Sequence, residues 1–143
     1  MEQVENKKGM SAVIFDNNGD YYFLIFHRVL GWEGWEFIKG EYNEGEEWKE
    51  AVFREVVRET GLSKFRVHKK LDIKYEFTMP DGTQCSNDVF LIETSMNIPV
   101  NTKSNDEHDT YLWATFDSAI DKLEFPEQKE MFRNAFEEIK KLN

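Results

Sequence analysis

Residues 40–62 read GEYNEGEEWKEAVFREVVRETGL, a stretch that predicts a loop followed by an amphipathic helix over about residues 46–60. The apolar residues that gather on one side of this helix, at about 100° per residue, are Val52, Phe53, Val56 and Val57. Glu55 and Glu59, four residues apart, lie one above the other along one edge. Such a pair is either a solvated face that repels itself slightly or a set of oxygen ligands for a hard divalent cation such as magnesium.

The spacing of residue types across this stretch favours the second interpretation. Its fixed positions are Gly40, then Glu46, Arg54-Glu55-Val56, Arg58-Glu59 and Gly61-Leu62. This pattern resembles the signature box of the Nudix hydrolases, which are magnesium-dependent enzymes that cleave nucleoside diphosphates linked to another moiety. The resemblance implies an α+β fold in which a mixed β-sheet is sandwiched between helices.

The same resemblance implies roles for the residues of the box. Glu55 and Glu59 would be catalytic metal ligands, and the carbonyl of Gly40 or its neighbour would join them. Glu46 and Arg54 would support the site, with the guanidinium fork of Arg54 orienting the carboxylates. The implied cofactor is Mg²⁺, with Mn²⁺ as an alternative.

Arg58 departs from the family pattern, which has a second glutamate at this position. Three interpretations stay open. Arg58 pairs with Glu55 and lowers the metal affinity, or it contacts a substrate phosphate, or it marks a protein that binds its ligand without turnover.

Length and charge limit the class of protein. A chain of 143 residues predicts a single domain, residues 1–143, with a sizeable core. A net charge of −10 argues against non-specific binding of nucleic acid, so a small nucleotide is the expected partner. The single Cys85 and the lack of an apolar start predict a cytoplasmic protein that does not enter membranes, and we expect a monomer or a homodimer.

Further elements are predicted along the chain. Structure is expected to begin near Gly9, and two antiparallel strands are expected at residues 10–15 and 21–27, the second covered on both faces. Three more strands are expected at residues 65–67, 71–77 and 87–93, with a turn at residues 80–82 and a loop at 95–106. Asp117 is expected to cap a short helix, and Pro126 to begin a last helix that packs on the sheet.

The segment before the box contains two candidate phosphate ligands. Residues 35–40, WEFIKG, resemble the Trp-x-Phe-Pro-Lys-Gly entry of the dinucleoside polyphosphate hydrolase branch of the Nudix family, with Ile38 in place of proline. By this resemblance Lys39 faces substrate phosphates, although it is otherwise an ordinary loop lysine. Arg28, at the end of a predicted strand, either meets solvent or neutralises phosphate at the rim of the site.

Residues 105–113, NDEHDTYLW, resemble a second segment of the asymmetric diadenosine tetraphosphate hydrolases. The matching position for a carboxylate that completes the metal site, or takes the proton of the attacking water, is Glu107. By the same resemblance His108 lies near the phosphates, and Tyr111 is a base-stacking or rim residue. Tyr75 and Phe77 are core residues by default, or stack on a base.

The resemblance implies Mg²⁺-dependent cleavage of diadenosine tetraphosphate to ATP and AMP by a metal-activated water. Glu55, Glu59 and Glu107 are the candidate ligands and bases. Removal of pyrophosphate from RNA 5′ ends is a related alternative, which the acidic composition disfavours. An alternative of another class is a nucleotide-binding module with weakened turnover, for which Arg58 is the support.

Overall fold

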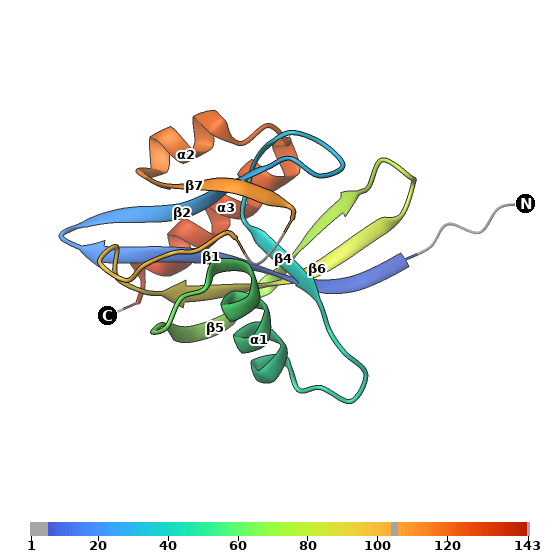
Figure 1. Ribbon diagram of the computed structural model, residues 1–143, viewed down its shortest axis with the longest axis horizontal. Coiled ribbons are helices and arrows are strands. Elements are labelled where there is room, and N and C mark those ends of the chain that lie inside the picture. Colours follow the sequence, from blue (N-terminus) through green and yellow to red (C-terminus); the bar gives the residue numbers. More distant parts are fainter. Residues whose placement is uncertain (1–5, 104–105, 143) are drawn as a thin grey trace, which may run out of the picture.

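A computed structural model describes residues 6–103 and 106–142, and within them seven strands and three helices form one mixed sheet with helices on both sides (Figure 1). The first strands are β1 (Asn6–Asn18), β2 (Asp20–Arg28), β3 (Gly34–Glu36) and β4 (Ile38–Glu41). Helix α1 (Trp48–Thr60) follows, then β5 (Arg66–Thr78), β6 (Gln84–Glu93) and β7 (His108–Ala114). The chain ends with α2 (Phe116–Lys122) and α3 (Pro126–Lys140).

The sheet is organised around the long strand β1. The strand order is β3-β2-β1-β6-β5, while β4 pairs with β1 and β7 pairs with β2. β1 and β6 are parallel and the other pairs are antiparallel. The predicted antiparallel pairing of residues 10–15 with 21–27 is therefore confirmed, and so is the turn at residues 80–82 that joins β5 to β6.

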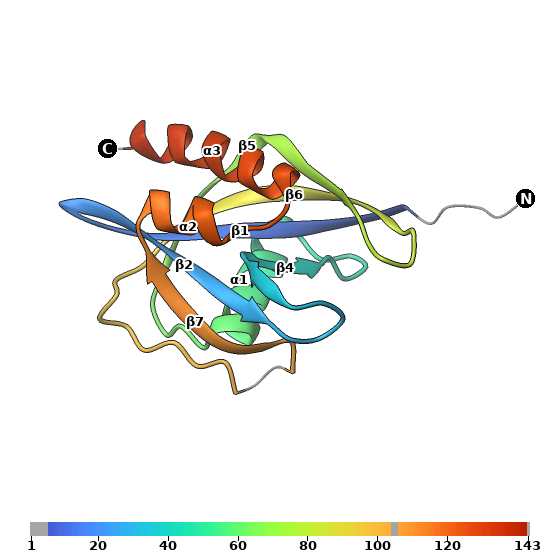
Figure 2. The same ribbon diagram turned by 90° about the horizontal axis from the view of Figure 1, so that it is seen from above.

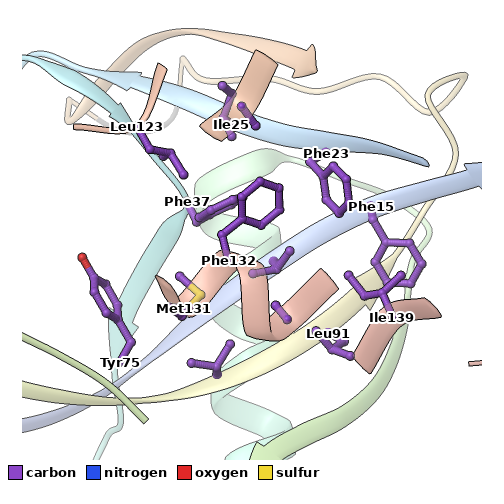
Figure 3. Packing of buried hydrophobic residues seen from close by; sticks show 14 of the residues in the cluster. Phe15, Phe23, Ile25, Phe37, Tyr75, Leu91, Leu123, Met131, Phe132 and Ile139 are labelled. Carbon is purple, nitrogen blue, oxygen red and sulfur yellow. The ribbon is translucent and has the colours of Figure 1, made fainter. Parts of the chain in front are cut away.

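Each face of the sheet has its own core. Met10, Ala12 and Ile14 of β1 pack towards α1, whereas the alternate residues Val13 and Phe15 pack towards α2 and α3. Figure 2 shows α2 and α3 on one side of the sheet and α1 on the other, and Figure 3 shows the aromatic packing around α3. The predicted α+β sandwich, and a second strand covered on both faces, are confirmed.

The inward face of α1 differs from the predicted one. Val52 and Val56 are buried, but Phe53 and Val57 are 58% and 41% exposed. The buried face instead includes the two box glutamates, because Gly40 of β4 lies against Glu55 and His108 of β7 lies against Glu59. Gly61 ends the helix with φ 69°, the left-handed conformation that the sequence predicted there.

Several boundaries also differ from the prediction. β1 begins at Asn6 rather than near Gly9, because its first residues pair with β6 from Gln84 onwards. The strands expected at residues 65–67 and 71–77 are one irregular strand, β5. The hydroxyl of Thr115 caps α2, so the prediction of Asp117 as the cap was wrong.

The last helix follows the prediction. Pro126 occupies its first turn, and the residues buried against the sheet include Met131, Phe132, Ala135 and Ile139. Of the loop expected at residues 95–106, residues 104 and 105 lie outside the described part, and the remainder contains no helix or strand. Among the helices of residues 6–103 and 106–142, none combines the length and the apolar character that a membrane crossing requires.

Candidate active site

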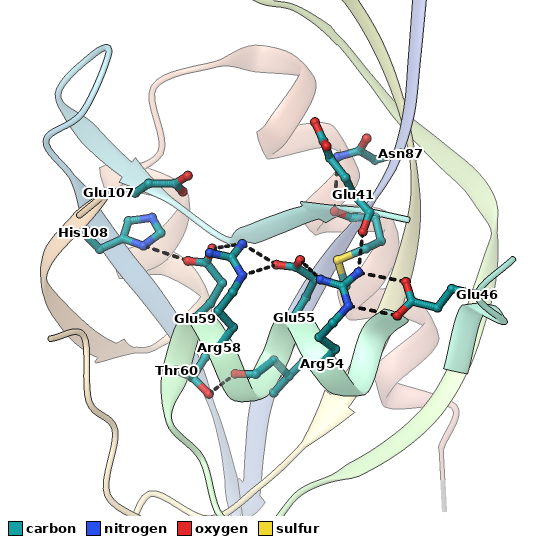
Figure 4. A network of polar contacts seen from close by, with 12 residues as sticks. Glu41, Glu46, Arg54, Glu55, Arg58, Glu59, Thr60, Asn87, Glu107 and His108 are labelled. Atoms are coloured by element: carbon teal, nitrogen blue, oxygen red, sulfur yellow. Dashed lines mark hydrogen bonds and ion pairs between the residues drawn. The ribbon is translucent and has the colours of Figure 1, made fainter. Parts of the chain in front are cut away.

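Helix α1 holds two buried carboxylates at the centre of the candidate site. Glu55 is 3% exposed and Glu59 is fully buried, and both lie on the helix face that points towards the loops (Figure 4). Gly40 on β4 makes room for Glu55, since a Cβ atom at residue 40 would collide with the Glu55 carboxyl group. The carbonyl oxygen of Gly40 faces Gly9 on β1, where an added Cβ would lie 2.5 Å from it.

Arg54 fixes the outer side of this carboxylate pair. Its Nε and Nη2 atoms each donate to the Glu46 carboxylate at 2.9 Å, its Nη2 also donates to the Glu41 carbonyl at 2.9 Å, and its Nη1 contacts Glu55. The Arg54 contact and a backbone N–H from Asn43 lower the pKa of Glu46 to about 2. The expected orienting role of Arg54 therefore has matching geometry.

Arg58 lies between the two buried carboxylates (Figure 4). Its Nη2 atom is 2.5 Å from Glu55 Oε2 and 2.7 Å from Glu59 Oε1, and its Nε donates to Glu55 Oε2 at 3.2 Å. These contacts and the nearby carboxylates raise the pKa of Arg58, although its partial burial acts in the opposite sense. The pairing with Glu55, one of three interpretations of this residue, is thus present in the structure.

A second polar cluster comes from β2, β3 and β7. Glu36 is 2% exposed, and the atoms around its carboxylate are Nη1 of Arg28 at 3.1 Å, Nζ of Lys39 at 3.4 Å and Nε2 of His108 at 2.8 Å. Burial raises the pKa of Glu36, but the three cationic neighbours outweigh it and hold the pKa below its usual value. Arg28 also reaches Glu107 Oε2 at 3.4 Å.

His108 links this cluster to α1. Its Nδ1 lies 3.4 Å from Glu59 Oε2, and its side chain is 1% exposed. Burial opposes the charged form of His108, but its contacts with Glu36 and Glu59 raise the pKa to about 9. His108 is therefore a buried imidazolium between the carboxylates of Glu36 and Glu59. Its side chain is not at a surface that a phosphate could reach directly.

Two cavities adjoin these clusters. The smaller, about 300 Å³, is lined by residues that include Glu55, Arg58 and Glu107. The larger, about 800 Å³, shares Arg28 and Lys39 with the smaller one. The two cavities also share Lys7, Lys8 and Phe77, and the larger one is further lined by the aromatic residues Trp32, Tyr75 and Phe125.

The remaining candidate site residues differ in whether they line one of these cavities. Lys39 lies with its Nζ 4.8 Å from the centroid of the Phe77 ring and lines both cavities, so its role as a phosphate ligand stays a prediction. Tyr111, 39% exposed on β7, is not among the residues that line either cavity, so the structure does not bring it to the site. His68 on β5 is largely buried, and its Nε2 atom lies 2.7 Å from Glu93 Oε1.

Glu36 is the site residue that the sequence analysis missed. It had been treated only as the variable position in the segment WEFIKG. The available signal was its position in an otherwise aromatic and aliphatic run, because an acid in such a run becomes buried and then requires cationic partners. Which partners it finds depends on β2 and β7, which are distant in sequence.

The donor set suits a divalent cation. Carboxylate oxygens are the ligands that Mg²⁺ prefers, and Glu55 and Glu107 line the smaller cavity. Glu59, one turn further along α1, is fully buried and does not line it. Glu36, Glu107 and His108 also have polar atoms within 4.8 Å of one another, but protonated His108 has no lone pair to offer a metal. A cation between Glu55 and Glu59 would take the place of the Arg58 guanidinium, whose side chain is 46% exposed and has room to move.

A helix that presents buried carboxylates to a cation-lined cavity defines a class of phosphate-handling protein. The family model for the NUDIX domain matches residues 5–135, so the chain belongs to that family. It is accordingly classed as a pyrophosphohydrolase, an enzyme that acts on phosphorus anhydrides. No curated protein matches the sequence.

Solved structures share the fold at low sequence identity. A C. elegans Ap4A hydrolase in a binary complex has a TM-score of 0.79 at 20% identity, covering 95% of this chain and 99% of its own. The E. coli dihydroneopterin triphosphate pyrophosphohydrolase has a TM-score of 0.72 at 17% identity, covering 92% and 97%. The NUDIX domain of Shewanella oneidensis NrtR, in complex with ADP ribose, has a TM-score of 0.71 at 12% identity, covering 96% and 90%.

Proposed function

We propose that this protein hydrolyses a nucleoside polyphosphate in a divalent-metal-dependent reaction, with diadenosine tetraphosphate as the leading substrate and ATP and AMP as products. The observation that carries the proposal is the continuity of the two cavities. One is walled by Glu55 and Glu107, the other by aromatic residues, and Lys39 and Arg28 belong to both. A polyphosphate chain fits the cationic part and a base fits the aromatic part.

The roles of the residues follow from their positions. Glu55, Glu59 and Glu107 would hold the cation, which would neutralise phosphate oxygens and make a neighbouring water more acidic. Glu107 is the best placed general base, since it lines the cavity with a side chain 32% exposed, whereas Glu59 is fully buried. Arg28 holds Glu107 in place, and Lys39 would neutralise phosphate charge.

The neighbours support the substrate class. Their ligands and substrates are Ap4A, dihydroneopterin triphosphate and ADP ribose, all of which contain phosphorus anhydrides. Removal of pyrophosphate from RNA remains less favoured, because the net charge of −10 repels a long polyanion. We also propose a cytoplasmic protein, monomeric or homodimeric, in keeping with its one free cysteine.

A second candidate is a nucleotide-binding module with weakened turnover. The observation that favours it is the contact of Arg58 with both α1 carboxylates, which would have to be broken before a cation could bind there. This module would bind the same class of nucleotide as the proposed hydrolase but would hydrolyse it more slowly.

Product analysis tests the proposal. The purified protein is incubated with diadenosine tetraphosphate, nucleoside triphosphates and ADP-ribose, each with and without Mg²⁺, and the products are separated by ion exchange. We expect Mg²⁺-dependent release of ATP and AMP from the first substrate. Detectable binding without any product would favour the weakened module, and products from another substrate alone would replace diadenosine tetraphosphate.

A further inference from the structure

The chain supplies its own cation to the two buried carboxylates of α1. The side chains of Glu55 and Glu59 are 4% and 0% exposed, so both charges are removed from water at adjacent turns of one helix. Two like charges in such a place are unfavourable unless a cation compensates them. Arg54 contacts Glu55 and protonated His108 lies 3.4 Å from Glu59, while Arg58 contacts both carboxylates with a single Nη2 atom, at 2.5 and 2.7 Å.

The surroundings of Arg58 and Arg54 differ, and the difference decides which of the two side chains a divalent cation could replace. Arg54 is tied to parts of the chain outside α1, namely the carboxylate of Glu46 and the carbonyl of Glu41. Arg58 contacts Glu55 and Glu59 of its own helix and interacts electrostatically with Glu107, and its side chain is 46% exposed at the wall of the smaller cavity. A long, half-exposed side chain can swing outwards without repacking the core.

We propose that Arg58 is an intrinsic counter-ion of the Glu55–Glu59 pair, which a divalent cation must displace in order to bind there. Arg58 is thus a residue that sets the metal affinity, and without metal its guanidinium compensates the charge of the pair together with Arg54 and His108. The inference rests on the proposed metal site but not on any substrate.

Metal binding without nucleotide tests the competition. Mn²⁺ is titrated into the full-length protein and free Mn²⁺ is followed by electron paramagnetic resonance. Arg58→Gln should bind Mn²⁺ about tenfold more tightly than the wild type, because the competing charged hydrogen bonds are gone. The matched control is Arg133→Gln, an exposed arginine of α3, which changes the net charge equally and should leave the affinity unchanged. Equal affinity of Arg58→Gln and the wild type would overturn the proposal.

Displacement itself is visible in the Nε–H signal of Arg58, which is assigned by its loss in Arg58→Gln. We expect this nuclear magnetic resonance signal to shift and to exchange faster with solvent in proportion to the Mg²⁺ bound. A signal that stays unchanged while Mg²⁺ saturates the site would overturn displacement.

Thermal stability provides a readout that does not depend on chemistry. Arg58→Glu should have a lower Tm than the wild type in EDTA, and Mg²⁺ should raise the Tm of the variant more than that of the wild type. Arg58→Gln is expected to change in the same direction if the glutamate variant does not fold. The same Mg²⁺ response in variant and wild type would count against the inference.

The outcomes separate this inference from the proposed function. A wild type that cleaves no nucleotide, while Arg58→Gln gains Mn²⁺ affinity, would refute the function and support the counter-ion. An active wild-type hydrolase whose Mn²⁺ affinity does not depend on Arg58 would support the function and refute the counter-ion.

Discussion

Glu36 shows how one buried acid organises the side of the site opposite α1. Its carboxylate is contacted by Arg28, Lys39 and His108, which belong to β2, β4 and β7. Because each of these cations is positioned by the same buried charge, Glu36 acts on the site through its neighbours rather than on a substrate.

Replacing Glu36 by Gln should therefore destabilise the fold. The variant leaves cationic groups buried without their carboxylate, so we expect a loss of roughly 3 kcal/mol in the free energy of unfolding. Urea denaturation at pH 7, followed by circular dichroism, measures it. Glu33→Gln is the matched control, since Glu33 is 76% exposed and its removal should cost at most about 0.5 kcal/mol. Equal losses in the two variants would contradict this account of Glu36.

The pKa of His108 makes a second prediction at the scale of one residue. The pKa of His108 in the folded protein, about 9, lies above the usual histidine value of 6.5. Protonated His108 therefore stabilises the fold fully below about pH 6.5, and this contribution is lost as the pH rises through about 9. The difference in unfolding free energy between the wild type and His108→Gln should shrink by about 1 to 3 kcal/mol between pH 6 and pH 10. Urea titrations at pH 6, 8 and 10 measure this difference, and a constant difference would show that His108 is neutral throughout.

At the scale of elements, α1 is the segment where hydrophobic periodicity misled us. The apolar side chains at positions 53 and 57 follow the helical period, yet they are exposed, and Phe53 contacts Phe65 at a ring distance of 5.0 Å. Periodicity assumes that the buried stripe is apolar. In a helix that also forms a polar site, buried glutamates occupy part of that stripe.

Adjacent valines of α1 test this orientation. Val56→Ala should cost about 1 to 3 kcal/mol of unfolding free energy, because Val56 is fully buried in the core between α1 and the sheet. Val57→Ala, the same substitution on the exposed side, should cost about 0.5 kcal/mol or less. Thermal or urea denaturation compares the two, and equal costs would mean that the helix is rotated relative to this description.

Strands with apolar and polar residues in clear alternation, or with many aromatic residues, were predictable from the sequence. Short strands, and strands that pair with partners distant in the sequence, were not. The β1–β2 pair and the last helix follow directly from apolar patterning and turn residues. β3, β4 and β7 are short or rich in polar residues, and their pairing with distant strands determines that they are strands at all. The Thr115 cap was missed because Asp117, two residues later, is an equally good cap by residue type.

At the scale of the whole molecule, an acidic protein concentrates cations where a phosphate would bind. The net charge is −10, yet Lys7, Lys8, Arg28 and Lys39 line one cavity. The start of β1, the end of β2 and β4 bring these residues together. Composition alone predicts repulsion of polyanions, whereas the fold gathers positive charge locally along one cavity.

The sequence predicted the part of the site that lies on one helix and much less of the rest. Glu55 and Glu59 share α1, so their proximity follows from helical geometry. The meeting of Glu36, Glu107 and His108 depends on the β2–β3 and β2–β7 pairings. The family pattern indicated Glu107 and His108 but not that His108 is buried between two carboxylates.

The most direct test of the central claim compares two glutamates of α1. Glu55→Gln should reduce the Mg²⁺-dependent rate of diadenosine tetraphosphate cleavage by about 100-fold or more, because it removes a carboxylate of the proposed metal site. Glu50→Gln, on the exposed first turn of the same helix, should retain the wild-type rate. The rate is measured as ATP and AMP released, for variants whose circular dichroism matches the wild type. Undiminished cleavage by Glu55→Gln, or no cleavage by the wild type, would contradict the account.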